Sequence, residues 1–427
     1  MDKINEKQLY EMERRVVITG LGVVSPVGNN ITDFWQNIVA GKCGIDLIKG
    51  YEGQELPISV AGQVKDFKPE EDGLDRNDIR RNDQFCIFAM AAANQAMADS
   101  GLKSGENIAP ERFGVYIGSG IGGMNTFVSE TEKLLNEGIR RISPLFVPMM
   151  ISNIASGNVA IKHNAQGACL PVVTACATGT TAAGEAYRAI KHGYADAIIA
   201  GGAEASINPL AIGGFANSKA LSRTEDPLKA SIPFNVNRNG FVMGEGAGVL
   251  IMESLENAQK RGAKIYAEVV GYGNSCDAHH VTAPSPDGIP ASRAIKQSLD
   301  EAQFDAEKDL LYINAHGTST PLNDKTETAA IKLAMGEEAA RKAIISSTKS
   351  MTGHMLGATG AVELIAATLT LKNGIVTPTI GLDEPDPECD LDYTPNVARK
   401  ADVTIAISNS LGFGGHNSCV ALRKWEE

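Results

Sequence analysis

The sequence predicts an α/β protein that contains one arrangement of strands and helices twice. Short apolar, β-branched runs ending near glycine alternate with alanine-rich helical stretches, a pattern typical of internal strands covered by helices. These runs fall into two series of five. The helical segments 179–193 and 360–374 also share a 14-residue step between glycines and the same apolar rhythm. An internal duplication is therefore expected.

Each predicted strand is short and apolar, as strands buried on both faces are. The first series comprises residues 15–21, 113–118, 171–175, 196–201 and 247–252, and the second comprises 265–272, 310–315, 343–347, 403–408 and 417–422. Segments 42–84 and 124–165 fit neither series, because they are irregular, proline-punctuated and mixed in charge. We expect them to be insertions that cap the N-terminal half and control access to a site.

The two halves are predicted to meet in the charged stretch 256–264. This gives an N-terminal half of residues 14–256 and a C-terminal half of residues 257–427. No proline- or serine-rich linker separates them, so one compact body is expected. A chain of 427 residues, 43% of them hydrophobic, is long enough to bury a sizeable core.

Composition excludes several classes of protein. A net charge of −12 argues against a nucleic-acid-binding surface. Seven cysteines without a C-x-x-C pair indicate neither a disulfide framework nor a zinc site, so no metal is expected and a reducing cytoplasm is the predicted location. Residues 1–15 are too charged for a signal peptide, and no run of 18 apolar residues suggests membrane insertion.

Cys176 is the strongest candidate for a reactive group. It lies where the third predicted strand ends and a helix of small residues begins. The positive end of a helix stabilises a thiolate, so we expect the pKa of Cys176 to fall below the ordinary value of about 8.5. We interpret Cys176 as a nucleophile. The other cysteines are interpreted as small buried hydrophobic residues.

Two histidines of the second half accompany this cysteine. His316 follows a predicted strand in Asn314-Ala315-His316-Gly317-Thr318, and His354 ends the segment that begins at Lys349. A thiol and two imidazoles in such settings predict Cys-His-His acyl chemistry. His163 and His192 lack a comparable setting and are interpreted as structural.

Five motifs in order identify a family resemblance that covers Arg15 to Lys424. They are Thr174-Ala175-Cys176, Ala200-Gly201-Gly202-Ala203-Glu204, His316 through Pro321, Lys349 through His354 with Leu356-Gly357, and Asn409 through Gly415. The chain resembles the elongating β-ketoacyl-acyl carrier protein synthases, most of all their synthase II group. The resemblance implies a thiolase-like, duplicated, five-layered α-β-α-β-α fold with cap insertions in the N-terminal half.

The resemblance also implies a decarboxylative Claisen condensation in fatty acid elongation. Cys176 would take the acyl group, and His316 and His354 would stabilise the enolate formed when malonyl-acyl carrier protein loses carbon dioxide. The backbone N–H groups of Cys176 and Phe413 would form a second oxyanion hole. Phe413, flanked by glycines, would gate the acyl pocket.

Further roles follow from the same resemblance. Lys349 would supply fixed positive charge, and Glu327 would anchor the surrounding network. Thr318 and Thr320 would bind the phosphopantetheine arm of the carrier protein, and Thr282 would also bind substrate. Because this arm is the only carrier of substrate expected, no cofactor is predicted.

The acyl pocket and the partners are also implied. Ile121 and Phe146 would shape the far end of the pocket, with Phe146 coming from the second subunit of a homodimer. Basic residues of the caps and of the 218–220 loop would dock the acidic carrier protein. These are Arg76, Arg80, Arg81, Arg140, Arg141 and Lys219.

Three other functions share features with this sequence. A ketosynthase of a polyketide or polyene pathway would share the catalytic residues, and the sequence separates it poorly from the first reading. A non-catalytic chain-length partner would lack the nucleophile, which Cys176 supplies. A thiolase would carry a C-terminal C-x-G, whereas Cys419 is followed by Val420 and Ala421. Leu411 and His416 depart from the residues common in the family beside the gate, so chain preference stays open.

Overall fold

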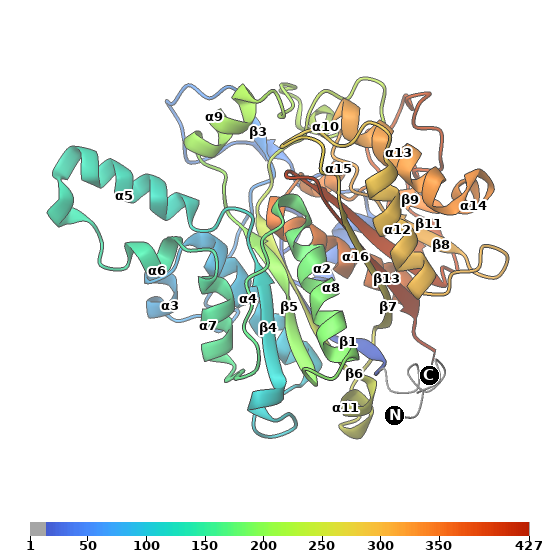
Figure 1. The fold of residues 1–427 in the computed structure, drawn as a ribbon. Helices are drawn as coiled ribbons and strands as arrows, with labels where there is room; N and C mark the ends of the chain where they lie inside the picture. Colours follow the sequence, from blue (N-terminus) through green and yellow to red (C-terminus); the bar gives the residue numbers. More distant parts are fainter. Residues whose placement is uncertain (1–13, 427) are drawn as a thin grey trace.

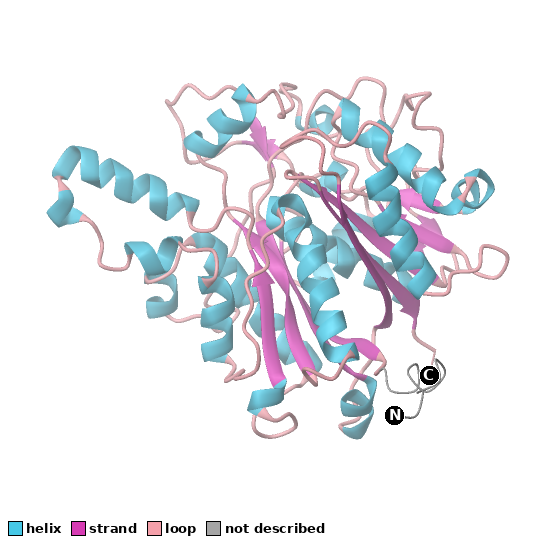
Figure 2. Cartoon of the chain, in the orientation of Figure 1, coloured by secondary structure: helices cyan, strands magenta, loops and turns pink. Residues whose placement is uncertain are grey.

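The computed structural model describes residues 14–426. The strands of its large sheet form two groups, here called the N-terminal and C-terminal arms, with helices between the arms and on their outer faces (Figures 1 and 2). Within these residues the ladder runs β4-β5-β6-β1-β7-β13-β12-β8-β9. The N-terminal arm contains β1 (Val16–Val24), β4 (Phe113–Gly118), β5 (Ala197–Glu204) and β6 (Gly246–Ser254). The C-terminal arm contains β7 (Ala267–Cys276), β8 (Leu311–Asn314), β9 (Ile344–Ser346), β12 (Ile405–Gly412) and β13 (His416–Lys424).

Helices complete five layers. On the outer faces, α4 (Gln84–Ser100) packs against β1 and β6, and α12 (Ile289–Glu301) packs against β7 and β13. Between the arms, α8 (Thr178–Lys191) contacts β5, α16 (Thr359–Asn373) contacts β12, and the two helices contact each other. Within residues 14–426, the strands of the two arms pair where Val16–Ile18 of β1 lie beside residues 267–269 of β7. This arrangement confirms the predicted α-β-α-β-α fold.

The remaining elements connect and cover these layers. The other helices are α2 (Ile31–Val39), α3 (Arg76–Arg80), α5 (Met124–Glu137), α6 (Phe146–Met150), α7 (Ile154–Lys162), α9 (Pro209–Asn217), α10 (Pro227–Ala230), α11 (Leu255–Lys260), α13 (Pro321–Met335), α14 (Glu337–Lys342) and α15 (Lys349–Thr352). The 3-10 turns are η1 (Pro110–Arg112), η2 (Ile139–Arg141), η3 (Ala175–Ala177) and η4 (Leu356–Ala358). Two small sheets pair β2 (Asp46–Leu47) with β3 (Val60–Ala61) and β10 (Ile375–Val376) with β11 (Arg399–Lys400). No helix within residues 14–426 has the length and apolar character needed to cross a membrane.

The two arms repeat one topology. When the strands of each arm are numbered in chain order, and the segment around Cys169 is counted as the third of the N-terminal arm, both arms read 3-2-4-5-1. In both arms strands 2 and 4 are parallel, whereas strands 4, 5 and 1 pair antiparallel. The repeated order and direction confirm the predicted internal duplication.

The predicted strand 171–175 is wrong. Val115 of β4 pairs with the segment at Ala168 and Leu170, but the ladder goes no further. At the next position the hydroxyl of Ser156 intervenes, accepting from the backbone N–H of Ile117 and donating to its carbonyl. A side chain from α7 therefore takes the hydrogen bonds that a strand would need. The segment continues without regular structure into η3.

The duplication extends to the central helices. A 3-10 turn precedes each of them, η3 before α8 and η4 before α16. The first residues of these turns, Ala175 and Leu356, have φ angles of 50° and 46°, which are strained for residues other than glycine. A Cβ on Gly360 would lie 2.1 Å from Oγ1 of Thr180, and one on Gly179 would lie 2.5 Å from the backbone nitrogen of Ala361. The two helices approach this closely because each has a glycine where it meets the other helix.

The cap insertions lie outside the repeated topology, as expected. The first, 42–84, carries the small β2-β3 sheet and α3. The second, 124–165, was expected to be irregular, but it holds α5, η2, α6 and α7. Figure 1 shows α5 extending away from the body of the molecule. This insertion is helical because Gly123 and Gly138 bound a polar amphipathic stretch that needs only one face covered.

Replacing Gly360 with alanine should destabilise the fold, because the added methyl group would overlap Thr180 in the central layer. We expect the free energy of unfolding in urea to fall by about 1–3 kcal/mol. Gly213→Ala in α9, where a Cβ would meet open space, is the matched control and should be neutral or stabilising. Equal stability of the two variants would contradict the proposed glycine contact.

Candidate active site

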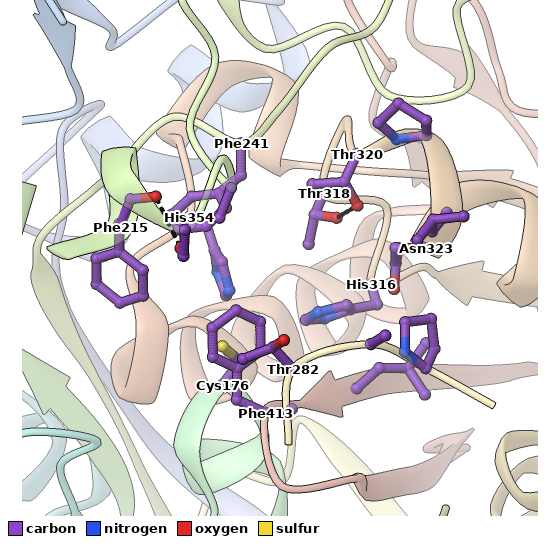
Figure 3. A pocket seen from close by; sticks show the side chains of 18 of the residues that line it. Cys176, Phe215, Phe241, Thr282, His316, Thr318, Thr320, Asn323, His354 and Phe413 are labelled. Carbon is purple, nitrogen blue, oxygen red and sulfur yellow. Dashed lines mark hydrogen bonds between the residues drawn. The ribbon is translucent and has the colours of Figure 1, made fainter. Parts of the chain in front are cut away.

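A cavity of about 430 Å³ brings the predicted nucleophile, both predicted histidines and the predicted gate residue together (Figure 3). Cys176 of the N-terminal half faces His316, His354 and Phe413 of the C-terminal half across it. Thr318, Thr320 and Thr282 also line its wall. The cavity lies between the arms, so neither half could form it alone.

Cys176 lies in the turn η3 immediately before α8. Cys176 is only partly exposed, and loss of water around its thiol raises the pKa to about 11, although the backbone N–H of Phe413 and the charge of Lys349 act in the opposite direction. The expectation of a lowered pKa is therefore wrong for the resting protein, because loss of water outweighs the helix end. The thiol is protonated at neutral pH.

Two backbone N–H groups lie at this sulfur. Those of Phe413 and of Cys176 itself both donate toward it and thereby favour its charged form. Phe413 follows β12 directly, and Cys176 is the middle residue of η3. Donors held in this way can stabilise a negative oxygen bonded to a carbon on the sulfur.

Both histidines are buried and neutral at neutral pH. Burial lowers the pKa of each imidazole well below its ordinary value, and the nearby charge of Lys349 lowers it further. The ring centroids of His316 and His354 lie 5.4 Å apart with the planes nearly perpendicular. Nδ1 of His354 lies 3.0 Å from Oγ1 of Thr359, which leaves Nε2 for the cavity. A neutral imidazole can still donate one hydrogen bond.

Carboxylates hold the loops on which these groups sit. Glu327 accepts from the backbone N–H groups of His316 and Gly317 at 2.7 and 2.8 Å, and from Nδ2 of Asn409 at 2.7 Å. Nζ of Lys349 lies 2.7 Å from Oε1 of Glu363, and both side chains are buried. Neither Lys349 nor Glu327 lines the cavity, so each acts from behind the first layer of side chains.

Phe413 lies in the turn between β12 and β13, where Gly414 and Gly415 have φ angles of 86° and 78°. Its ring is 6.3 Å from that of Phe215, which is 5.5 Å from Phe241. Phe241 in turn meets His354 edge to face at 5.3 Å. A row of aromatic rings therefore joins the turn to the catalytic region.

The turn is also tied to the neighbouring loop. The N–H of Gly414 donates to the carbonyl of Val281, and the N–H of Asp277 donates to that of Gly415. Leu411 lines the cavity below the turn, and His416 stands at the start of β13 behind it.

Sequence reasoning missed four contributors, namely Phe215, Phe241, Glu363 and Glu204. Glu363 could have been found, because it is an acidic residue in the otherwise apolar helix α16. Glu204 ends the motif that begins at Ala200, but the motif by itself indicates no role for it. The two phenylalanines carry no signal in the sequence, since only the folded chain places them beside the cavity.

Other predicted residues lie away from the cavity. Ile121 is in the loop after β4, and Phe146 begins α6. Of the predicted docking residues only Lys219 lines the cavity, at its mouth, with a φ of 59°. The five arginines lie elsewhere, with Arg76, Arg80 and Arg81 at α3 and Arg140 and Arg141 in η2.

Comparison with known families matches both halves. The profile described as "Beta-ketoacyl synthase, N-terminal domain" matches residues 13–258, and "Beta-ketoacyl synthase, C-terminal domain" matches residues 266–383. The chain belongs to the β-ketoacyl synthase family. This membership agrees with the two-armed fold and with a cavity built from both halves.

Curated relatives of this synthase match it over nearly their whole length. The 3-oxoacyl-[acyl-carrier-protein] synthase 2 of Staphylococcus aureus strain COL is 51% identical over 413 residues, which is 97% of this chain and 99% of the relative. The enzyme of the same name from Synechocystis is 50% identical over 415 residues, covering 97% of this chain and 99% of the relative.

Solved structures similar to this synthase include two ketosynthases. One is a type II polyketide acyl carrier protein in complex with its ketosynthase bound to the hexaketide (TM-score 0.88, 38% identity, covering 97% of this chain and all of that chain). Another is the ishigamide ketosynthase/chain length factor (TM-score 0.89, 35% identity, with the same coverage).

Alkylation of Cys176 by iodoacetamide should be slow at neutral pH and should accelerate about tenfold per pH unit between about pH 7 and about pH 10. The reason is that the thiolate is the nucleophile and the pKa of this thiol is about 11. Peptide mass spectrometry would follow the modified residue, with buried Cys86 and Cys419 as unreactive references. A rate that is already constant near pH 8 would show that burial does not control this thiol.

Proposed function

We propose that this synthase condenses an acyl chain held on Cys176 with malonyl-acyl carrier protein, giving 3-oxoacyl-acyl carrier protein and carbon dioxide in fatty acid elongation. The observation that carries the proposal is the placement of one thiol and two neutral imidazoles around a single cavity. The names of the two curated relatives support the same reaction.

In the first half-reaction, the sulfur of Cys176 attacks the carbonyl carbon of an acyl thioester. The bond from that carbon to the pantetheine sulfur breaks, and the proton of Cys176 passes to the departing sulfur. Because the thiol is protonated at rest, this coupled proton transfer is part of the step. The N–H groups of Phe413 and Cys176 stabilise the oxyanion that forms in between.

In the second half-reaction, malonyl thioester loses carbon dioxide, and the electron pair of the broken bond forms an enolate. Nε2–H groups of His316 and His354 would donate to the enolate oxygen, each worth about 3–4 kcal/mol. The hydroxyl of Thr359, donating to Nδ1 of His354, would hold the proton on Nε2. The enolate carbon then attacks the acyl carbon, and the released Cys176 sulfur regains a proton.

The carrier protein is the proposed partner. Thr318 and Thr320, whose hydroxyls lie 2.9 Å apart on the cavity wall, are placed to bind the amides of the phosphopantetheine arm. Lys219 at the mouth would contact the acidic carrier protein. The solved ketosynthase in complex with its acyl carrier protein supports this assignment. The chemistry above needs no further cofactor, and we expect it to take place in the cytoplasm.

A homodimer is proposed from one apolar flank of the N-terminal arm. Here α5, α6, α7 and β4 contact each other in series (Figure 1). Large apolar side chains stay exposed along this flank, namely Leu135, Ile139, Val147, Ile161, Leu170 and Val173. Leu170 and Val173 belong to the segment beside β4, beyond which no further strand of residues 14–426 pairs. An exposed apolar strand edge favours association with another chain. A second copy of this chain would cover the edge, and its Phe146 would approach Ile121 of the first copy.

A ketosynthase of a polyketide or polyene pathway is the alternative function. It is favoured by the type II polyketide ketosynthase and the ishigamide ketosynthase/chain length factor among the similar structures. Their identity of 38% and 35% is lower than the 51% shared with the Staphylococcus aureus synthase, so fatty acid elongation is preferred.

Intact-mass measurement of acyl-enzyme formation tests the proposed reaction across carrier-protein thioesters of different chain length. Wild-type enzyme should gain one acyl group, and Cys176→Ala should gain none while remaining folded. His316→Ala and His354→Ala should still load the acyl group but decarboxylate malonyl-carrier protein about 10²–10³-fold more slowly. Persisting acylation of C176A, or equal loss of both half-reactions in the histidine variants, would refute the assigned roles.

Light scattering after gel filtration tests the dimer. Wild-type protein should have twice the chain mass of 45.1 kDa. Leu170→Asp should run nearer to one chain mass, because a charge would be buried on the proposed interface. Leu333→Asp, at an equally exposed leucine of α13, is the control and should stay dimeric. A monomeric wild-type protein would overturn the proposal.

A further inference from the structure

Glu204, the last residue of β5, has no part in the reaction described above, although it is fully buried beside the site. Five hydrogen-bond donors of the described residues face its carboxylate, an environment that favours the ionised form. Oε2 accepts from the backbone N–H groups of Gly120 and Gly357 at 2.8 and 3.1 Å. Oε1 accepts from the Ser119 hydroxyl, the Ile121 N–H and the Ser206 hydroxyl at 3.0, 3.2 and 3.1 Å.

These bonds join the two halves of the molecule next to the reacting groups. The 119–121 loop follows β4 of the N-terminal arm, whereas Gly357 lies in the η4 turn three residues after His354. A Cβ on Gly120 would lie 2.7 Å from Oε2 of Glu204 and 3.6 Å from the carbonyl oxygen of Ala175. The carboxylate therefore lies directly behind the turn that carries Cys176.

The duplication makes Gly357, which Glu204 binds, the structural counterpart of Cys176. Gly357 occupies in η4 the middle place that Cys176 occupies in η3. At Cys176 the N–H at the start of the central helix faces the sulfur, whereas at Gly357 the equivalent N–H is taken by Glu204. One helix end is thus open to the cavity, and the other is closed by a fixed internal anion.

The charge of Glu204 also acts on the thiol. The titratable groups around Cys176 are Lys349 and Glu204 behind the cavity, and His316, His354, Asp277 and Lys219 on its wall. Lys349 favours the thiolate, and Glu204 opposes it. Burial raises the pKa of Glu204, while the hydrogen bonds from Gly357 and Gly120 counteract that rise.

We propose that Glu204 is a positioning residue with two effects. Its carboxylate fixes the Ile121 loop and the turn after His354 against Cys176, and its negative charge, held behind the turn that carries Cys176, lowers the reactivity of the resting sulfur. The first effect rests on the proposed acyl transfer, whereas the second concerns the resting thiol alone.

The test compares wild-type enzyme with Glu204→Gln, Glu204→Asp and the control Glu253→Gln. Glu253 is an equally buried glutamate on the neighbouring strand β6. It pairs with Ala197, at the end of β5 opposite to Glu204. Melting temperature, iodoacetamide alkylation of Cys176 at about pH 8, and acylation by carrier-protein thioesters would be measured for each.

E204Q removes the charge, so Cys176 should be alkylated about tenfold faster than in wild type, which corresponds to about one unit of thiol pKa. E204D keeps the charge but cannot reach both loops, so its alkylation rate should stay within about twofold of wild type. Acylation should fall about tenfold or more in both variants, because the loops shift relative to Cys176. E253Q should match wild type in both assays.

Equal acceleration of alkylation in E204Q and E204D would indicate mere opening of the site and would overturn the charge effect, as would no acceleration in E204Q. If E204Q does not fold, the positioning effect is tested with E204D alone. Folded E204D that is acylated at the wild-type rate would overturn it. If neither variant folds while E253Q does, Glu204 is a folding determinant and the proposal fails. Absence of acylation in wild-type enzyme would instead refute the proposed function, and the alkylation rates would still test the charge effect.

Discussion

The close contact of α8 and α16 is the constraint on which the site depends. Gly179 and Gly360 allow the first turns of the two helices to touch backbone to backbone. Cys176 precedes the first helix, and His354 precedes the second. A side chain at either glycine would overlap the facing helix and push the two turns apart. Catalytic geometry is thus set by close packing in the middle layer, where the structure is least able to yield.

Exclusion of water from this region controls the charge of every group in it. Burial keeps both histidines neutral and the thiol protonated, and Lys349 and Glu204 act on that thiol with opposite sign. Hydrogen bonds from a neutral imidazole to an enolate gain strength in such surroundings. The cost of burying the supporting charges is offset by the Lys349–Glu363 pair and by the donors around Glu327.

The duplicated halves supply different chemistry from one backbone plan. Both helices start from a 3-10 turn whose first residue is strained, Ala175 in one case and Leu356 in the other. The first turn offers a thiol to the cavity, whereas the second offers glycine and is closed by Glu204. The asymmetry of the site therefore arises from a few side chains and not from a difference in topology.

The sequence by itself determined nine of the ten predicted strands and the repeat, and it predicted the chemistry of Cys176, His316 and His354, because apolar periodicity and motif spacing are local properties of the chain. Only the tertiary structure decided the features that depend on distant partners. Ser156 of α7 ended the predicted strand at 171–175, and enclosure by both halves raised the pKa of Cys176 where its helix end alone suggested a fall. Phe215 of α9 and Phe241 of the segment before β6 became part of the cavity wall only in the folded chain. Hydrogen-bond competition and desolvation are set by what lies across the fold, and no neighbour in the sequence carries that information.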